Sequence, residues 1–115
     1  VGQDSSNILK GVAASPGKVT GRARVIMDPE QLYEIQKGEI LICRITAPSW
    51  APVFPMISAA VSDVGGMMAH TAIISREYGL PAVVGTGFAS SIFKTGDLVE
   101  VDGNFGTVKR LEEAV

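Results

Sequence analysis

Residues 65–85 read GGMMAHTAIISREYGLPAVVG, and this stretch decides the fold of the chain. The glycine pair at its start lets the backbone turn sharply. A helix is predicted from about Met67 to Tyr78, and Gly79 stands where a left-handed cap residue ends a helix. The short apolar run from Ala82 to Val84 is then expected to form a buried strand. The stretch therefore predicts a turn, a helix and a strand in immediate succession.

Short elements separated by turns are expected on both sides of this stretch, because 13 of the 115 residues are glycine. Strands are predicted from apolar patterning at Ile8 to Val12, Val19 to Val25 (with a possible bulge at Gly21), Ile40 to Ile45 and Ala59 to Val64. Short helical segments are predicted from Asp28, with Pro29 next, to no further than Gly38, within Ala47 to Pro55, and at Phe88 to Phe93. A terminal hairpin is predicted from Leu98 to Val101 and Thr107 to Leu111. This order predicts a mixed α/β fold with more than one sheet.

The composition excludes several classes of function. Only one cysteine, Cys43, and one histidine, His70, are present, so the chain lacks the three or four Cys and His ligands of a usual zinc site. The 10 basic and 12 acidic residues give a net charge of −2, with no basic excess for binding nucleic acid. We therefore expect no metal site in this chain and no nucleic-acid partner.

The sequence also carries expectations about location and extent. No apolar run approaches the ~20 residues of a membrane span, and residues 1–4 lack the basic-then-apolar pattern of a signal peptide. Because one cysteine cannot build a disulfide framework, a cytoplasmic protein with no membrane partner is expected. Residues 1–7 are expected to fray, residues 8–111 to form one domain and residues 112–115 to form a tail. The first residue is Val1 rather than methionine, so a piece of a longer polypeptide is expected.

His70 stands near the start of the predicted helix, shortly after the glycine pair. The first N–H groups of a helix have no partner within it and, together with the helix dipole, bind anions. Side chains lean toward the helix N-terminus, so the imidazole is expected beside these groups, with Gly65, Gly66 and Thr71 as candidate phosphate-binding residues. A neutral imidazole is a good nucleophile at pH 7. The arrangement suits a histidine that takes up a phosphoryl group, but no motif for activating ATP is recognisable in the sequence.

Structural interpretations of the same residues stay open at this point. A lone histidine on a helix is more often a packed, hydrogen-bonded residue. Gly85-Thr86-Gly87 begins a dinucleotide-like pattern but lacks its third glycine. Cys43, Trp50 and Phe54 are interpreted as core residues, although Trp50 and Phe54 could also form a docking surface. Arg76, in the last turn of the predicted helix, is expected to complement the carbonyl end of that helix or to pair with a carboxylate.

The block from Gly65 to Gly85 resembles the phosphohistidine motif of the phosphoenolpyruvate-utilising enzymes. The shared pattern is a glycine pair, a histidine, a small-apolar helix with Arg-Glu, and Gly-x-Pro-Ala-Val-Val-Gly, at Gly65, Gly66, His70, Ala72, Arg76, Glu77, Gly79, Pro81, Ala82, Val83, Val84 and Gly85. The resemblance extends from about residue 8 to residue 111. It includes Gly11 to Gly21, a Thr-x-Pro-x-Trp segment within Cys43 to Trp50, and the closing hairpin at Val101 to Val108.

This resemblance implies a swivelling β/β/α phosphohistidine domain, with mixed sheets and short helices. It implies that His70 is phosphorylated during turnover. The implied partners are an ATP-grasp nucleotide-binding domain and an acceptor-binding domain, in the same chain or as separate subunits. ATP and Mg²⁺ are expected on the nucleotide-binding partner, and no cofactor is expected on this domain itself. The implied function is that of a mobile carrier, inactive alone, within a dikinase-type phosphotransferase.

The loop at Pro48 to Pro52 looks most like the phenylphosphate synthase and rifampicin phosphotransferase branch, and phosphoenolpyruvate synthase-like members are also similar. The resemblance therefore implies an acceptor such as phenol or pyruvate. Plant dikinases carry Thr-Ser before the histidine, with the Thr as a regulatory site; Met68-Ala69 stand here, so such regulation is not implied. Two other classes stay open: a non-catalytic swivelling module of a larger enzyme and, more remotely, a metal enzyme.

Overall fold

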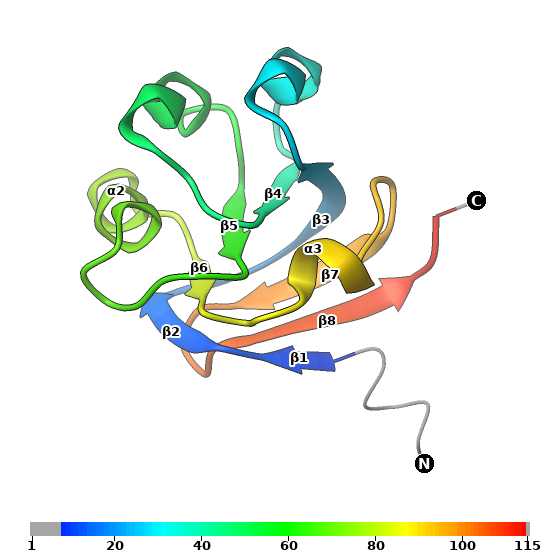
Figure 1. The fold of residues 1–115 in the computed structure, drawn as a ribbon. Helices are drawn as coiled ribbons and strands as arrows, with labels where there is room; N and C mark the ends of the chain where they lie inside the picture. The colour runs from blue at the N-terminus through cyan, green and yellow to red at the C-terminus, as the bar shows by residue number, and fades with distance from the viewer. Residues whose placement is uncertain (1–7, 115) are drawn as a thin grey trace.

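A computed structural model describes residues 8–114, and Figure 1 shows their fold. The strands in this range are β1 (Ile8–Lys10), β2 (Val12–Ser15), β3 (Lys18–Ile26), β4 (Ile40–Cys43), β5 (Ala59–Ser62), β6 (Ala82–Val84), β7 (Leu98–Asp102) and β8 (Thr107–Glu112). Between them lie the α-helices α2 (His70–Tyr78) and α3 (Ala89–Ile92) and the 3₁₀ helices η1 (Pro29–Glu34) and η2 (Pro48–Val53). The segment predicted to fray, residues 1–7, lies outside the described residues.

The strands are hydrogen-bonded in the order β1-β8-β7-β3-β4-β5-β6-β2, which confirms the predicted mixed α/β architecture. β3, β4, β5 and β6 run parallel to one another, whereas the pairings of β1, β2, β7 and β8 are antiparallel. β3 belongs to two sheets, because Lys18 to Arg22 pair with β7 and Ala23 to Ile26 pair with β4. The outermost strands β1 and β2 are separated by Gly11 alone, so the chain connects the two sheets at that point as well.

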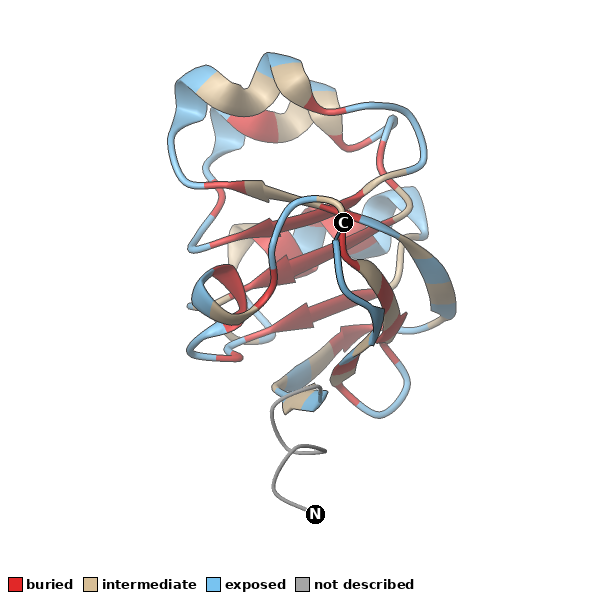
Figure 2. Ribbon diagram, turned by 90° about the vertical axis from the view of Figure 1, so that its right-hand side faces the viewer, coloured by how far each residue is buried: buried red, intermediate tan, exposed pale blue. Residues whose placement is uncertain are grey.

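The fold has three layers, in which α2 covers one face of the parallel strands (Figure 1). Successive side chains of a strand point to opposite faces, and β4 shows this alternation fully. Leu41 and Cys43 face the core on the α2 side, whereas Ile40 and Ile42 face the core shared with β7 and β8. Figure 2 shows the central strands buried along most of their length. The parallel strands are therefore held rigidly between two apolar cores.

Three predicted core residues are confirmed. Trp50 is 6% exposed and Phe54 is fully buried, and both pack in the core on the α2 side. Cys43 lies in the same core, where burial raises the pKa of its thiol to about 12. The thiol is therefore protonated at neutral pH, as expected of a packing residue.

Several element predictions are confirmed in detail. Asp28 caps η1, because its carboxylate accepts a hydrogen bond from the N–H of Glu30. Gly79 ends α2 in the left-handed conformation, at φ 70°. The terminal hairpin forms as β7 and β8. β8 continues to Glu112, and the N–H of Ala114 donates to a carboxylate oxygen of Asp97, so residues 112–114 follow the domain.

Other boundaries differ from the predicted ones where the chain leaves the parallel sheet. β4 and β5 each end two residues earlier than predicted, so Ile45 and Val64 lie in exposed loops. α2 begins at His70, three residues later than predicted, because a turn precedes it in which the N–H of Ala69 donates to the carbonyl of Gly66. The apolar residues at these loop positions face solvent instead of extending the strands or the helix.

The predicted bulge at Gly21 is wrong. The register of β3 with β7 continues unshifted through this residue, which lies opposite Val99, and β3 changes its partner to β4 after Arg22. The single strand predicted from Ile8 to Val12 is also wrong, because the N–H of Gly11 donates to the carbonyl of a hairpin glycine and separates β1 from β2. Among the helices of residues 8–114, none combines the length and apolar character that a membrane crossing requires.

Candidate functional site

His70 is the first residue of α2 and lies at the carboxyl end of the parallel strands. β5 ends at Ser62, and a loop with the glycine pair leads from it to the helix. Gly65 adopts φ 131°, a conformation that residues with a Cβ rarely adopt. The histidine is half-buried at the end of this loop.

A second glycine holds this loop close to the next strand. Gly85, directly after β6, adopts φ 66°, and a Cβ placed on it would lie 2.7 Å from the carbonyl oxygen of Gly65. No side chain fits in this contact without displacing the loop. The predicted phosphate-binding residue Gly66 lies beside Gly65 and is half-buried, with open space around its Cα.

The imidazole ring of His70 is held from two sides. Its Nδ1 lies 2.8 Å from Oγ1 of Thr46, at hydrogen-bond distance. The ring of Phe54 packs edge-on against it, with 6.1 Å between ring centroids and 89° between the ring planes. Within residues 8–114, no hydrogen bond occupies the other ring nitrogen, Nε2. The ring is thus oriented through one nitrogen, which leaves the second available for chemistry.

The hydroxyl of Thr46 has a second partner. Its Oγ1 lies 2.6 Å from Oγ1 of Thr71, and both threonine side chains are buried. A chain of hydrogen bonds therefore runs from His70 through Thr46 to Thr71. The structure turns the Thr71 hydroxyl toward the interior of the domain, so its predicted contact with a phosphate stays a prediction.

The start of α2 carries no side-chain cap. Ala69 occupies the N-cap position and provides no acceptor for the first N–H groups of the helix. Together with the helix dipole, these groups favour an anion beside His70 by about 0.3–1 kcal/mol. This contribution favours a phosphoryl group on the imidazole but is too small to drive phosphoryl transfer.

Arg76 fastens the helix to the loop that precedes it. One guanidinium nitrogen donates to the carbonyl of Ala14 in β2, and another donates to the carbonyl of Met67, each at 2.8 Å. The expectation that Arg76 complements the end of its own helix or pairs with a carboxylate is therefore wrong. Its role is to hold the glycine loop and α2 against the sheet.

Thr46 is the residue of this site that the sequence pattern did not single out as functional. It lies three residues past the end of β4, next to the loop after β5, because the two strands are parallel neighbours. The Thr-x-Pro-x-Trp segment that begins at Thr46 was the available indication of its importance.

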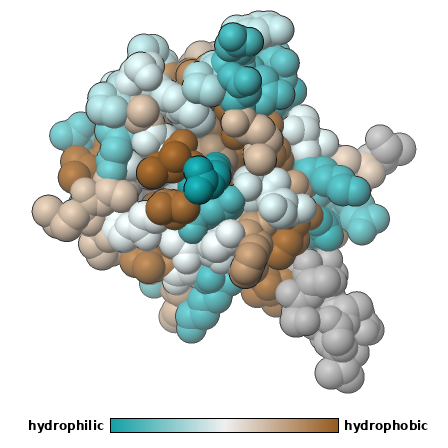
Figure 3. All heavy atoms as spheres, in the orientation of Figure 1, coloured by the Kyte–Doolittle hydropathy of each residue, from teal (hydrophilic) through white to brown (hydrophobic). Residues whose placement is uncertain are grey.

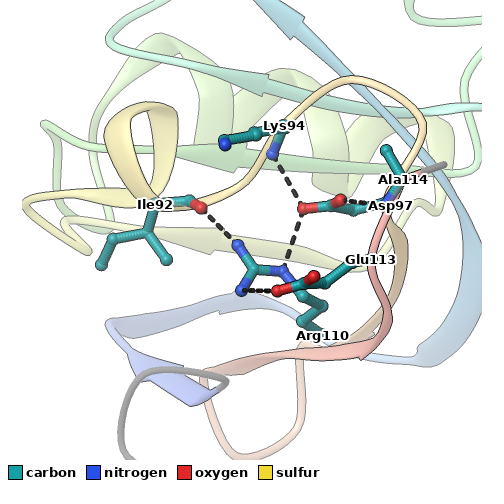
Figure 4. Close-up of a pocket in the computed structure, with 6 residues that line it drawn as sticks. All are labelled: Ile92, Lys94, Asp97, Arg110, Glu113 and Ala114. Carbon is teal, nitrogen blue, oxygen red and sulfur yellow. Dashed lines mark hydrogen bonds and ion pairs between the residues drawn. The ribbon is translucent and has the colours of Figure 1, made fainter.

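A separate polar hollow of about 290 Å³ lies on another part of the domain (Figure 4). Asp97 and Arg110 form a buried ion pair in it, with 3.0 Å between Oδ2 and Nε. Arg110 also donates to the carbonyl of Ile92 and lies over the ring of Phe93. These contacts tie the last strand to α3 and the loop before β7, so we interpret the hollow as structural. Among the described residues, no three His, Cys, Asp or Glu side chains gather as metal ligands would.

Comparisons with known proteins find both a matching family and similar chains. Residues 35–106 match the family described as PEP-utilising enzyme, mobile domain. The chain is 48% identical over 102 residues to phosphoenolpyruvate synthase of Aeropyrum pernix, covering 88% of this chain and 12% of that protein. It is 39% identical over 106 residues to an uncharacterised phosphotransferase, YvkC, of Bacillus subtilis, covering 92% of this chain and 13% of that protein. It is 42% identical over 107 residues to the prodigiosin synthesizing transferase PigC of Serratia marcescens, covering 92% of this chain and 12% of that protein.

Solved structures share the fold. A solution structure of an Enzyme I protein superposes with a TM-score of 0.61 at 39% identity, covering 70% of this chain and 33% of that one. The aconitase X of Thermococcus kodakaraensis superposes with a TM-score of 0.70 at 20% identity, covering 91% of this chain and 98% of that one, and shows likeness of fold alone. The chain thus spans 12 to 13% of the length of the three sequence relatives.

Proposed function

The chain belongs to the mobile, phosphohistidine-domain family of the PEP-utilising enzymes, and from that premise we propose that its His70 carries a phosphoryl group between two partner sites. The observation that supports this most is the arrangement of one imidazole at an uncapped helix start, with Nδ1 held by Thr46. Gly65 and Gly66 place the loop there, and their backbone is proposed to contact the phosphoryl group.

We propose Nε2 as the phosphorylated atom. In the reactive tautomer, Nδ1 carries the proton and its N–H donates a hydrogen bond to Oγ1 of Thr46, whose own hydroxyl donates to Oγ1 of Thr71. The lone pair of Nε2 attacks phosphorus, an N–P bond forms, and the bond from phosphorus to the donor's leaving oxygen breaks. The electron pair of that bond stays on the leaving oxygen of the donor, and the Nδ1 proton does not move. Thr46 and Phe54 thus act as positioning residues.

The proposed donor is ATP with Mg²⁺, bound by an ATP-grasp partner in the same polypeptide or in a separate subunit; transfer in reverse would start from phosphoenolpyruvate. Several relatives are named phosphoenolpyruvate synthase, which favours pyruvate as the acceptor. Phenol is the other proposed acceptor. A second partner binds the acceptor, and the carrier alone does not turn over.

The test uses the polypeptide or subunit assembly in which this sequence occurs. It is incubated with Mg²⁺ and ATP labelled on either the β- or the γ-phosphate, and the chain is examined for an acid-labile, base-stable phosphate. The proposal predicts label on the wild-type chain and none on His70→Ala. A non-catalytic swivelling module would take up no label in either case. Chase with pyruvate or phenol then identifies the acceptor by which compound removes the label.

A further inference from the structure

Exposed apolar side chains gather at the edge of the domain where His70 lies. β3, β4, β5 and β6 are parallel, so the loops that follow them meet at one edge. Each loop presents exposed apolar side chains, and together they form what we name the apolar rim: Met27, Ile45, Val64, Met67, Met68 and Phe88. Figure 3 shows apolar patches bordering a strongly hydrophilic one over the region of β4 and β5.

The rim contains a hollow next to the histidine site. A cavity of about 240 Å³ opens between the loops after β3 and β4, and Met27, Ile45 and Trp50 form much of its apolar wall. Thr46, whose hydroxyl contacts His70, also lines it. The cavity is large enough for one apolar side chain, and it adjoins the residue that orients the imidazole.

Arg44 is the charged residue of this hollow. It is exposed, and in the described part of the chain its guanidinium makes no hydrogen bond or ion pair. The other four arginines all bind carboxylates or backbone carbonyls: Arg22, Arg24, Arg76 and Arg110. The backbone of Arg44 is held in place, because its carbonyl accepts a hydrogen bond from the N–H of Val64 between the loops that follow β4 and β5. Arginine is one of the residues enriched at the hot spots of protein interfaces, and here it adjoins an apolar hollow.

We propose that the apolar rim is the docking surface for the nucleotide-binding partner, which inserts an apolar side chain into the cavity and places a carboxylate on Arg44. This inference rests on the proposed function and identifies the partner's chemistry at the same site. The donor must bring phosphorus to about 3–3.5 Å from Nε2, so the donor-bearing partner covers the loops that flank His70.

Three further considerations favour this occupant. The relatives are about seven times as long as this chain, so they contain polypeptide that can supply such a surface. An acidic group on the partner would complement the charge of Arg44. Methionine side chains also adapt their shape at binding surfaces, and Met67 and Met68 lie just before the histidine, with Met68 81% exposed.

The test compares Arg44→Glu and Arg44→Gln with Lys109→Glu, which introduces the same charge reversal at an exposed position of β8 away from the rim. Each chain is expressed separately and phosphorylated by the nucleotide-binding part of its assembly with ATP and Mg²⁺, at varied carrier concentration. Docking predicts an apparent KM for the carrier raised about tenfold or more in Arg44→Glu, an intermediate rise in Arg44→Gln, and no change in Lys109→Glu. The phosphorylation rate of Arg44→Gln is expected to depend less on salt concentration than the wild-type rate does.

Phosphoramidate, a small phosphoryl donor that needs no docking, serves as the second arm. All variants are expected to take up phosphate from it at the wild-type rate, which shows that His70 and the fold are intact. An unchanged KM in Arg44→Glu, with His70 still labelled by ATP, overturns the docking surface and leaves the proposed function standing. Failure of the wild type to accept label from ATP, while phosphoramidate labels it, overturns both. If the wild-type chain dimerises as its concentration rises, and Arg44→Glu abolishes this dimerisation, the apolar rim binds a second copy of the chain. That result overturns the proposal.

Discussion

The hydroxyl oxygen of Thr46 lies 2.8 Å from Nδ1 of His70, although 24 residues separate them in the sequence. Strand pairing produces this contact. Cys43 and Ser62, the last residues of β4 and β5, are partners in the parallel sheet, so the loops that follow leave the sheet side by side. The orientation of the imidazole is therefore set by the sheet and by the buried hydroxyls of Thr46 and Thr71.

Replacing Thr46 by valine tests this orientation. The variant removes the partner of Nδ1 and leaves the Thr71 hydroxyl buried without one, so the reactive tautomer is no longer favoured. We expect phosphorylation of His70 to slow about tenfold, which corresponds to the loss of about 1.4 kcal/mol from one hydrogen bond. ¹⁵N NMR of the ring would show a changed tautomer balance.

Thr46→Ser is the matched control, because it keeps the hydroxyl and removes a methyl group. Its rate and its ring spectrum are expected to stay near those of the wild type. If both variants slow phosphorylation equally with unchanged tautomer balance, Thr46 acts through packing and not through Nδ1.

Gly85→Ala tests the contact between the loops after β5 and β6. A Cβ here would meet the carbonyl of Gly65 at 2.7 Å, so the glycine loop must move away from its position before His70. We expect slower phosphorylation as well as lower stability. Gly79→Ala is the control, since it shares the left-handed φ but meets no atom within 4 Å. It should lose about 1 kcal/mol of stability in a denaturant titration and keep its phosphorylation rate.

Asp97→Asn tests the ion pair with Arg110. Burial acts to raise the pKa of Asp97, but hydrogen bonds from the N–H groups of Lys94 and Ala114 and from the Arg110 guanidinium outweigh it and lower the pKa below its usual value. The carboxylate therefore stabilises the fold above about pH 4, and this stabilisation is lost as the pH falls through the lowered folded-state pKa.

We expect the asparagine variant to lose about 1.5–3 kcal/mol of unfolding free energy at pH 7, because the charged hydrogen bond to Arg110 is lost, although Glu113 stays 3.9 Å from that guanidinium. The loss should shrink toward pH 3. Glu112→Gln, which removes an exposed ion pair with Arg22, is the control and should change stability by less than about 1 kcal/mol. Equal losses at pH 7 and pH 3 would contradict the assignment of the titration to Asp97.

Ser75→Ala is expected to stabilise the domain. Within the described residues, the Ser75 hydroxyl of α2 is fully buried and has no hydrogen-bond partner. Removing it relieves the desolvation of an unpaired polar group and raises helix propensity, a gain of about 1 kcal/mol. Thermal unfolding measures the gain, with exposed Ser91→Ala in α3 as the control. A lower melting temperature for Ser75→Ala would show that this hydroxyl is satisfied in the folded protein.

Local patterning was sufficient to predict most of the elements. Asp28 and Pro29 indicated the start of η1, Gly79 indicated the end of α2, and the apolar runs indicated β4, β5 and β6. Their ends were misjudged where exposed apolar residues follow a strand. Hydropathy alone does not distinguish a buried apolar residue from an exposed one, and Ile45 and Val64 are exposed examples.

Long-range contacts were beyond local patterning. His70 was identified from its place after the glycine pair, but its partner Thr46 comes from a different loop, brought near by strand pairing. Arg76 was assigned to its own helix end because sequence spacing shows only neighbours along the helix. Its actual acceptors lie in β2 and in the glycine loop. The order of strands decides such contacts, and that order is not encoded in any single segment.

The central claim is that Nε2 of His70 carries the phosphoryl group. Its most direct test is a ³¹P–¹H NMR correlation on the ¹⁵N-labelled chain after phosphorylation by its nucleotide-binding partner with ATP and Mg²⁺. We expect a single acid-labile phosphorus bonded to Nε2 of the one histidine, with the proton retained on Nδ1 and hydrogen-bonded to Oγ1 of Thr46. A phosphorus signal on Nδ1, or one that persists in His70→Ala, would contradict it.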